Sequence, residues 1–145
     1  MIRNEREYRI TKAARRRFEE AIEAHKTATP PEGVDPRIHA ATGDAMRSEV
    51  EVLSEQIQRY EDLRNGRIRQ RELSSLSDLP TALIEARIAA GLTQKGLANR
   101  LGLQQQQIQR WESDRYSGVG LRRIQEVIDA LGMGITESVR YAAAA

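Results

Sequence analysis

The chain has 145 residues, of which 39% are hydrophobic and 4% aromatic, enough for one ordinary domain or two small ones. It has no cysteine and two histidines, which excludes a disulfide framework and a thiolate metal site and argues against zinc. The charge is uneven, because residues 1–66 carry 12 Lys and Arg against 13 Asp and Glu, whereas residues 67–145 carry 11 against 8. A polyanionic partner is therefore expected to bind the second half.

Two further patterns bear on location and chemistry. The N-terminus MIRNEREYRI is charged and is followed by no apolar segment of a signal peptide, and no run approaches the roughly 18 apolar residues of a membrane span. We therefore expect a cytoplasmic protein without membrane contact. The sequence offers no nucleophile–base–acid set, no phosphate loop and no group of metal ligands. It predicts no catalytic residues, no metal, no cofactor and no enzymatic activity.

The first predicted helix starts at the N-cap Thr11 and runs to His25 or Thr27. Spacings of three and four predict that its inward face comprises Ala14, Phe18, Ala21, Ile22 and His25. Residues 28–36, ATPPEGVDP, contain three prolines and a glycine, which cannot continue a helix. This segment is predicted to be a turn between two antiparallel helices.

A long second helix is expected over residues 37–65. Apolar residues recur on it in steps of 4, 3, 4 and 3, and this heptad seam consists of Met46, Val50, Leu53, Ile57 and Tyr60. We expect Ile38, Thr42 and Ala45 to extend the seam toward the start of the helix. Two interpretations stay open: the seam mediates dimerisation, or it packs on the first helix of the same chain. Both can hold, because a two-helix hairpin has a small core of its own.

Residues 67–78 begin basic and end rich in serine, and we interpret them as a linker. Beyond them, caps and apolar spacings predict four short helices, over residues 79–90, 94–101, 104–113 and 121–131. Asp78 and Thr93 are expected to cap the first two of these helices, and Gly102 to supply a left-handed turn. The expected core residues include Leu97, Ala98, Leu101, Ile108, Trp111, Leu121, Ile124, Val127, Ile128 and Leu131. Ile135, Val139 and Tyr141 in the tail are candidates for a strand or turn at a dimer interface.

The pattern T-Q-x-x-L-A-x-x-L-G-x-x-x-x-x-I-x-x-W-E begins at Thr93 and ends at Glu112. It resembles the helix-turn-helix of the phage Cro/repressor type, the XRE family, and the resemblance covers residues 79–133. One departure is Gly96, where the family carries Glu or another good helix former; a helical glycine costs roughly 1 kcal/mol. The first half more weakly resembles bacterial regulators that begin like NEREYRITKA, some of which resemble antitoxins.

The resemblance implies a recognition helix whose N-terminal part meets base edges in the major groove. Glutamine amides suit the adenine edge and arginine suits guanine. The expected base-reading residues are Gln104, Gln105, Gln106, Gln109 and Arg110. The expected phosphate contacts are Thr93, Gln94, Lys95, Arg115, Tyr116, Arg122 and Arg123. For Tyr116 the alternative is a place at the edge of the core. The family pattern also implies an internal ion pair between Arg87 and Glu112.

Together these expectations describe an all-α protein. A helical hairpin over residues 1–66 serves dimerisation or partner binding, a linker spans 67–78, a helix-turn-helix domain spans 79–134, and a tail spans 135–145. The expected function is that of a sequence-specific DNA-binding regulator, a nucleoid-associated homodimeric repressor of a palindromic operator. The alternative is an antitoxin that binds a partner toxin and regulates its own promoter.

Overall fold

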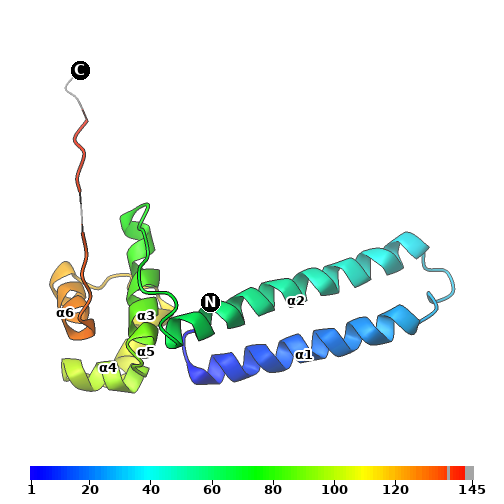
Figure 1. Ribbon diagram of the computed structural model, residues 1–145, viewed down its shortest axis with the longest axis horizontal. Coiled ribbons are helices and arrows are strands. Elements are labelled where there is room, and N and C mark those ends of the chain that lie inside the picture. Colours follow the sequence, from blue (N-terminus) through cyan, green and yellow to red (C-terminus); the bar gives the residue numbers. More distant parts are fainter. Residues whose placement is uncertain (137, 143–145) are drawn as a thin grey trace. The chain divides into compact units, whose positions relative to one another are not determined.

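The computed structural model describes residues 1–136 and 138–142, and the regular elements in this part of the chain are all helices. The expected all-α class is therefore confirmed. The chain divides into two compact units, Met1–Glu72 and Leu73–Ala145 (Figure 1). Residues 137 and 143–145 of the expected tail lie outside the described residues. None of the described helices combines the length and the apolarity needed to cross a bilayer.

The first unit is an antiparallel hairpin of α1 (Glu5–Thr27) and α2 (Pro36–Arg64). The prediction that Thr11 caps α1 is wrong. Asn4 is the cap, because its side-chain oxygen accepts a hydrogen bond from the Glu7 amide at 2.9 Å, while the Thr11 hydroxyl donates to the Glu7 carbonyl inside the helix. At the turn, Asp35 caps α2 and Pro36 occupies its first position, where a missing amide hydrogen costs little.

The heptad seam of α2 packs against α1 of the same chain. The Tyr8 and Tyr60 rings stack with centroids 5.1 Å apart, and the Tyr8 hydroxyl donates to Glu61 at 2.5 Å. Ile57 and Tyr60 are buried within a single copy of the chain, whereas Met46, Val50 and Leu53 are half-buried. One of the two open interpretations of the seam, packing within the chain, thus describes the structure.

Toward the turn, the seam continues through residues other than those expected. Ile38, Thr42 and Ala45 are exposed, so this part of the prediction is wrong. The facing positions are His39 and Gly43: the His25 and His39 rings stack at 3.8 Å, and a β-carbon at Gly43 would meet the His25 ring at 3.0 Å. The heptad spacing continues toward the turn, but its positions there are a histidine and a glycine. The prediction followed apolar residues and therefore missed both.

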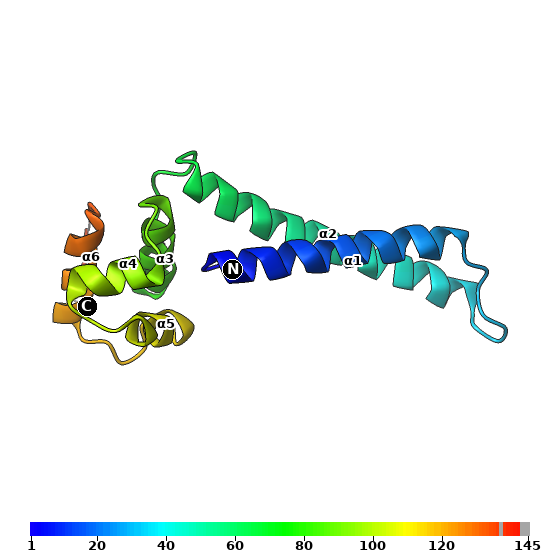
Figure 2. The same ribbon diagram turned by 90° about the horizontal axis from the view of Figure 1, so that it is seen from below.

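The second unit begins with a 3₁₀ turn, η1 (Leu76–Asp78), and continues with α3 (Leu79–Ala89), α4 (Gln94–Leu101), α5 (Gln105–Ser113) and α6 (Leu121–Leu131). In it, α4 packs against α5 and α6, and α3 packs against α6 (Figure 2). Asp78 makes no side-chain cap on α3, contrary to expectation. Its carboxylate accepts from the Ser74 and Ser75 amides in a capping box that starts η1.

Leu83, Leu97, Ile108 and Val127 form the centre of the core of the second unit, and each is fully buried. Leu121 was expected there but is 83% exposed. It is the first residue of α6, and helical side chains lean toward the N-terminus, so this side chain projects past the core edge.

Gly96 in α4 provides a test of local helix stability. A β-carbon there would lie 3.4 Å from the nearest side-chain atoms, which is ordinary contact, and the Thr93 cap bonds only the Gly96 backbone. We expect Gly96→Ala to stabilise the second unit by roughly 1 kcal/mol, because alanine restricts the unfolded chain and favours helix. Urea unfolding followed by the fluorescence of the single tryptophan, Trp111, measures this change. A lower midpoint would show that the position needs glycine.

Candidate nucleic-acid interface

A buried ion pair fixes α5 relative to α3 and α4. The Arg87 guanidinium donates two hydrogen bonds to the Glu112 carboxylate, from Nε at 2.5 Å and from the second terminal nitrogen at 2.9 Å. The Gln94 amide donates at 2.7 Å to Oε2 of Glu112, the oxygen that also accepts the second of these bonds, and Arg87 also donates to the Leu92 carbonyl at 2.8 Å. Arg87 and Glu112 are 2% and 1% exposed, so the pair forms the internal bridge that the resemblance implied.

Local sequence sets the turn between α4 and α5. The Thr93 hydroxyl caps α4 by accepting from the Gly96 amide at 2.9 Å, as expected. Gly102 ends α4 with φ of +66°, a left-handed conformation that penalises any β-carbon. Ala98 on α4 is fully buried, and a side chain this small suits the close approach of two crossing helices. These features and the ion pair hold the angle between the two helices.

The surface side of α5 is polar throughout. Ile108 and Glu112 point into the domain, while the five expected base-reading residues, Gln104, Gln105, Gln106, Gln109 and Arg110, are all exposed. Gln104 is the N-cap of α5, but its side-chain amide makes no capping hydrogen bond to the first turn of the helix. The helix therefore presents a row of amides and one guanidinium to solvent.

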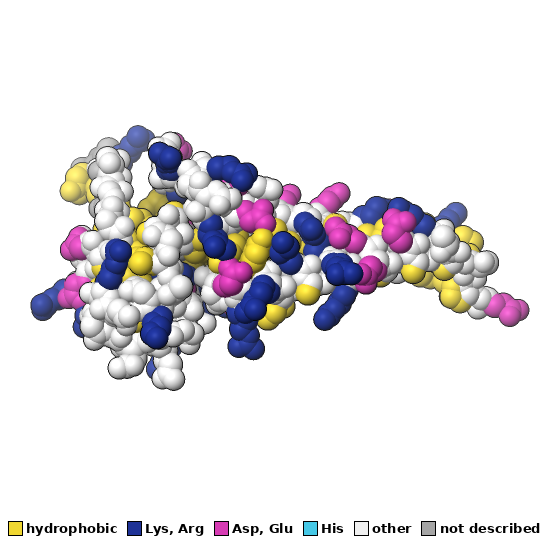
Figure 3. All heavy atoms as spheres, turned by 60° about the horizontal axis from the view of Figure 1, so that its bottom comes forward, with side chains coloured by type: hydrophobic (Ala, Val, Ile, Leu, Met, Phe, Trp, Pro, Cys, Tyr) yellow, Lys and Arg dark blue, Asp and Glu magenta, His cyan; other side chains and the backbone are white. Residues whose placement is uncertain are grey.

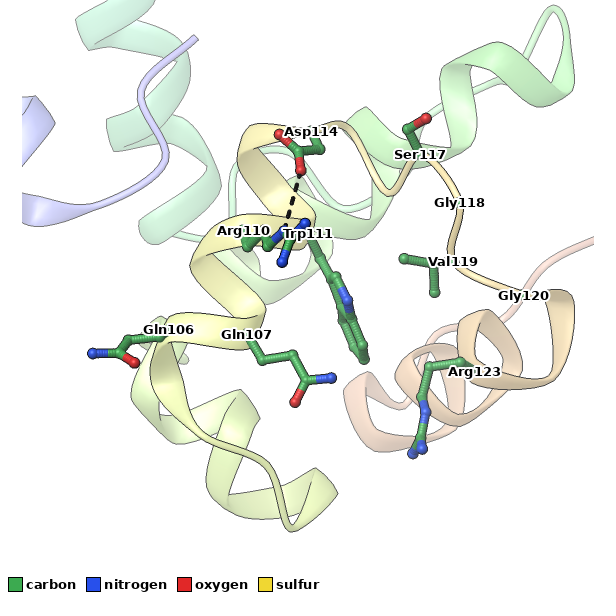
Figure 4. Close-up of a pocket in the computed structure, with 10 residues that line it drawn as sticks. All are labelled: Gln106, Gln107, Arg110, Trp111, Asp114, Ser117, Gly118, Val119, Gly120 and Arg123. Atoms are coloured by element: carbon green, nitrogen blue, oxygen red, sulfur yellow. Dashed lines mark ion pairs between the residues drawn. The ribbon is translucent and has the colours of Figure 1, made fainter.

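A shallow, open hollow of about 590 Å³ lies beside α5. It is lined by Gln106, Gln107, Arg110, Trp111, Asp114, Ser117, Gly118, Val119, Gly120 and Arg123. Figure 4 shows the Trp111 ring at its base, Gln107 pointing toward that ring, and Gln106 pointing away from it. The hollow brings the polar side of α5 together with the loop that follows it and with Arg123 on α6. Trp111 is half-buried, so part of its side chain packs in the core and part lines the hollow.

Carboxylates accompany the exposed arginines of this surface. Arg110 lies 3.8 Å from Asp114, and Glu126 pairs with both Arg122, at 3.6 Å, and Arg123. These pairs lie at the surface, where screening makes each worth about 1 kcal/mol or less. A phosphate can therefore displace the carboxylates at small cost. Lys95, on the first turn of α4, is exposed.

The remaining expected phosphate contacts lie differently. The Gln94 side chain is 7% exposed and braces α5 through Glu112. Arg115 reaches back to the Ser77 carbonyl and the Thr81 hydroxyl, both at 3.4 Å. Tyr116 is 4% exposed, so it lies in the core edge rather than at the surface. Arg115 and Tyr116 both have positive φ, at 52° and 55°, which marks a strained loop after α5.

The buried Tyr116 hydroxyl has no hydrogen-bond partner among the described residues. Burial raises the pKa of this phenol above its usual range, and the nearby Glu112 carboxylate acts in the same direction, so the group stays neutral. We expect Tyr116→Phe to stabilise the second unit by about 1 kcal/mol, because an unsatisfied buried hydroxyl is removed. The affinity for DNA should not change. A tenfold loss of affinity would instead place this hydroxyl on a phosphate.

Comparison with known families agrees with this geometry. The family described as helix-turn-helix matches residues 83–138, from the middle of α3 past the end of α6. The second unit is an XRE-family helix-turn-helix domain. The chain is therefore a DNA-binding transcriptional regulator. Searches of curated proteins and of solved structures find no match.

The structure adds residues to the XRE domain surface that sequence reasoning missed. Gln107 lines the hollow although it was not among the expected base-reading residues. Asp114 and Glu126 were not singled out, yet each restrains an arginine that faces the same surface. Both pairs could have been predicted from the sequence, because Arg110 and Asp114, like Arg122 and Glu126, are four residues apart and so lie on the same side of a helix.

Proposed function

We propose that this protein is a sequence-specific repressor that binds a palindromic operator as a homodimer. One observation carries the proposal: α5 presents a row of exposed amides and Arg110, while a buried ion pair holds it rigidly against α3 and α4. In this account the XRE domain binds DNA, the hairpin of the first unit joins two chains, and the segment around residues 67–78 links them. The protein acts on the nucleoid in the cytoplasm.

The chemistry of α5 suits base edges in the major groove. An amide donates and accepts at once, which matches the adenine edge, and a guanidinium donates two hydrogen bonds to guanine. Gln105, Gln106 and Arg110 take these roles in the proposal. Affinity comes mainly from phosphates, for which Thr93, Lys95, Arg122 and Arg123 are the exposed candidates. Gln94 contributes by bracing α5, and Arg115 by tying the following loop to the start of α3.

Footprinting on a duplex that carries a selected site tests this function. Two copies of α5 in successive major grooves should protect two patches on one side of the duplex, about 34 Å apart. The pattern should be symmetric about the centre of the site, and placing the site over a promoter should lower transcription of a reporter gene. A single protected patch at saturation would contradict the dimer, and an unchanged reporter would contradict repression.

A second candidate function is that of an antitoxin, and one observation favours it. In the tail, Val139 and Tyr141 are 75% and 85% exposed, so both side chains are accessible to a partner protein. In this alternative the tail or the hairpin binds a toxin while the XRE domain represses the shared promoter. Purification from the source cell should then yield a small stoichiometric partner. Recovery of only the protein and DNA would contradict it.

A further inference from the structure

The two broad faces of the hairpin differ sharply in composition. The inward positions of α1 are Tyr8, Thr11, Arg15, Phe18, Ile22 and His25, and they face the α2 seam from Tyr60 back to Gly43. In an antiparallel pair, positions one residue before the inward ones lie on the same broad side of both helices. Stepping back one residue turns the side-chain direction by about 100° around the helix axis. Because the two helices run in opposite directions, this step turns the side chains of both helices toward the same broad side of the hairpin.

The positions one residue before the inward ones form what we term the apolar face. Its apolar part consists of Ile10, Ala14, Arg17, Ala21 and Ala24 on α1 and Ile38, Thr42, Ala45, Glu49 and Val52 on α2. The same positions continue into the polar residues Glu7, Gln56 and Arg59 at the end of the hairpin where α2 ends. Its three largest apolar side chains are well exposed: Ile10 is 58%, Ile38 61% and Val52 44% exposed. Figure 3 shows hydrophobic side chains reaching the surface along the hairpin.

The positions one residue after the inward ones form the opposite face, which we term the charged face. It consists of Arg9, Lys12, Arg16, Glu19, Glu23 and Lys26 on α1 and Ala40, Asp44, Arg47, Glu51, Ser54, Gln58 and Glu61 on α2. Several of these residues form ion pairs within the hairpin, such as Lys26 with Glu23 and Arg47 with Asp44. The charged face is thus an ordinary solvated surface, whereas the apolar face lacks a cover within the described unit.

We propose that a second copy of this chain covers the apolar face and forms a four-helix bundle. The inference rests on the homodimer proposed above and names the surface that makes it. Ile57 and Tyr60 of the seam are already buried inside one chain, so the seam is not the surface that remains for a partner. Covering the apolar face gives the thin hairpin a second layer and a core between four helices.

The charges on the apolar face select the symmetry of this dimer. Arg17 and Glu49 lie near its centre, within one helical turn of the same level, and neither forms an ion pair with another described residue. If the two-fold axis runs parallel to the helices, α1 of one copy lies against α2 of the other, and Arg17 meets the partner's Glu49 twice. If the axis runs across the helices, Arg17 meets its own copy and Glu49 meets its own copy, which is repulsive.

The favoured axis has a consequence for DNA binding. A rotation about an axis parallel to the helices preserves their direction, so both α2 helices end at the same end of the bundle. The two chains that continue into the XRE domains therefore leave together, as one operator requires. The crosswise axis would separate those ends by about 43 Å, the length of a 29-residue helix.

Cross-linking tests the surface and the axis together, because the chain contains no cysteine of its own. A mixture of Arg17→Cys and Glu49→Cys chains should give a covalent dimer with a short bismaleimide, while Arg17→Cys alone should give little. Lys12→Cys on the charged face, mixed with Glu49→Cys, is the matched control and should not react. Efficient linkage of Arg17→Cys to itself would overturn the proposed symmetry.

Sedimentation of the full chain provides the second readout. The wild type should sediment at twice 16.4 kDa at micromolar concentration. Val52→Glu, on the apolar face, should weaken dimerisation at least tenfold with its helix content intact, whereas Gln58→Glu, on the charged face, should not. A wild-type monomer, or a stoichiometric complex with another protein in place of the dimer, would overturn the inference. A dimer that Val52→Glu leaves intact and that shows no linkage of 17 to 49 would overturn this surface but not the proposed repressor.

Discussion

Replacing Glu112 by glutamine is expected to destabilise the XRE domain more than any surface change. The Arg87 guanidinium is 2% exposed and pairs with the buried Glu112 carboxylate at 2.5 Å. Removing one partner of a buried ion pair costs about 3–5 kcal/mol, because a buried charge is left uncompensated. For a domain of this size, each kcal/mol lowers Tm by roughly 4–8 °C. We therefore expect Tm to fall by at least about 12 °C.

The same substitution elsewhere in the domain provides the control. Glu126 also pairs with arginines, but on the surface of α6, where such pairs contribute about 1 kcal/mol or less. Trp111 is the single tryptophan and precedes Glu112, so its fluorescence during heating reports on this unit. Similar midpoints for Glu112→Gln and Glu126→Gln would contradict the structural role of the buried pair.

The second large effect is expected at the DNA. Gln105 is exposed on the first turn of α5, the part of a recognition helix that meets base edges. We expect Gln105→Ala to lose about 1–3 kcal/mol of binding to the selected site and little binding to random DNA. The two losses differ because the amide binds particular bases, whereas phosphate contacts contribute equally to binding of every DNA sequence.

Gln125→Ala is the matched control for this measurement. Gln125 is also exposed on a helix of the XRE domain, but its amide donates to Asp129 on α6, at 2.9 Å. Its replacement should leave the affinities for the selected site and for random DNA unchanged within experimental error. Fluorescence anisotropy at fixed salt gives the two dissociation constants for each variant, since affinity for DNA depends steeply on salt. Equal losses on selected and random DNA would remove Gln105 from the base-reading residues.

The boundaries of the XRE helices were predictable because local chemistry determines them. Thr93 at a cap and Gly102 at positive φ act within one turn of the residues they order, so a sequence pattern shows them directly. The pairing of Arg87 with Glu112 was different in kind. It joins residues 25 apart in the sequence, and only the family resemblance indicated it.

The errors arose where tertiary position overrode a local pattern. His39 and Gly43 occupy the seam because the stacked histidines need a residue without a side chain beside them, and apolar spacing does not show this. Leu121 has the spacing of a core residue but stands at the end of its helix, beyond the core. Asn4 was predictable, since an asparagine three residues before a glutamate is typical of a helix start.

Selection of bound sites from random DNA, combined with the mass of the complex in solution, tests the central claim most directly. We expect two symmetric half-sites about one helical turn apart, bound by two chains. Enrichment should depend on Gln105 and Arg110. A protein that stays monomeric at micromolar concentration and enriches no motif would contradict the claim that the exposed side of α5 reads DNA as part of a dimer.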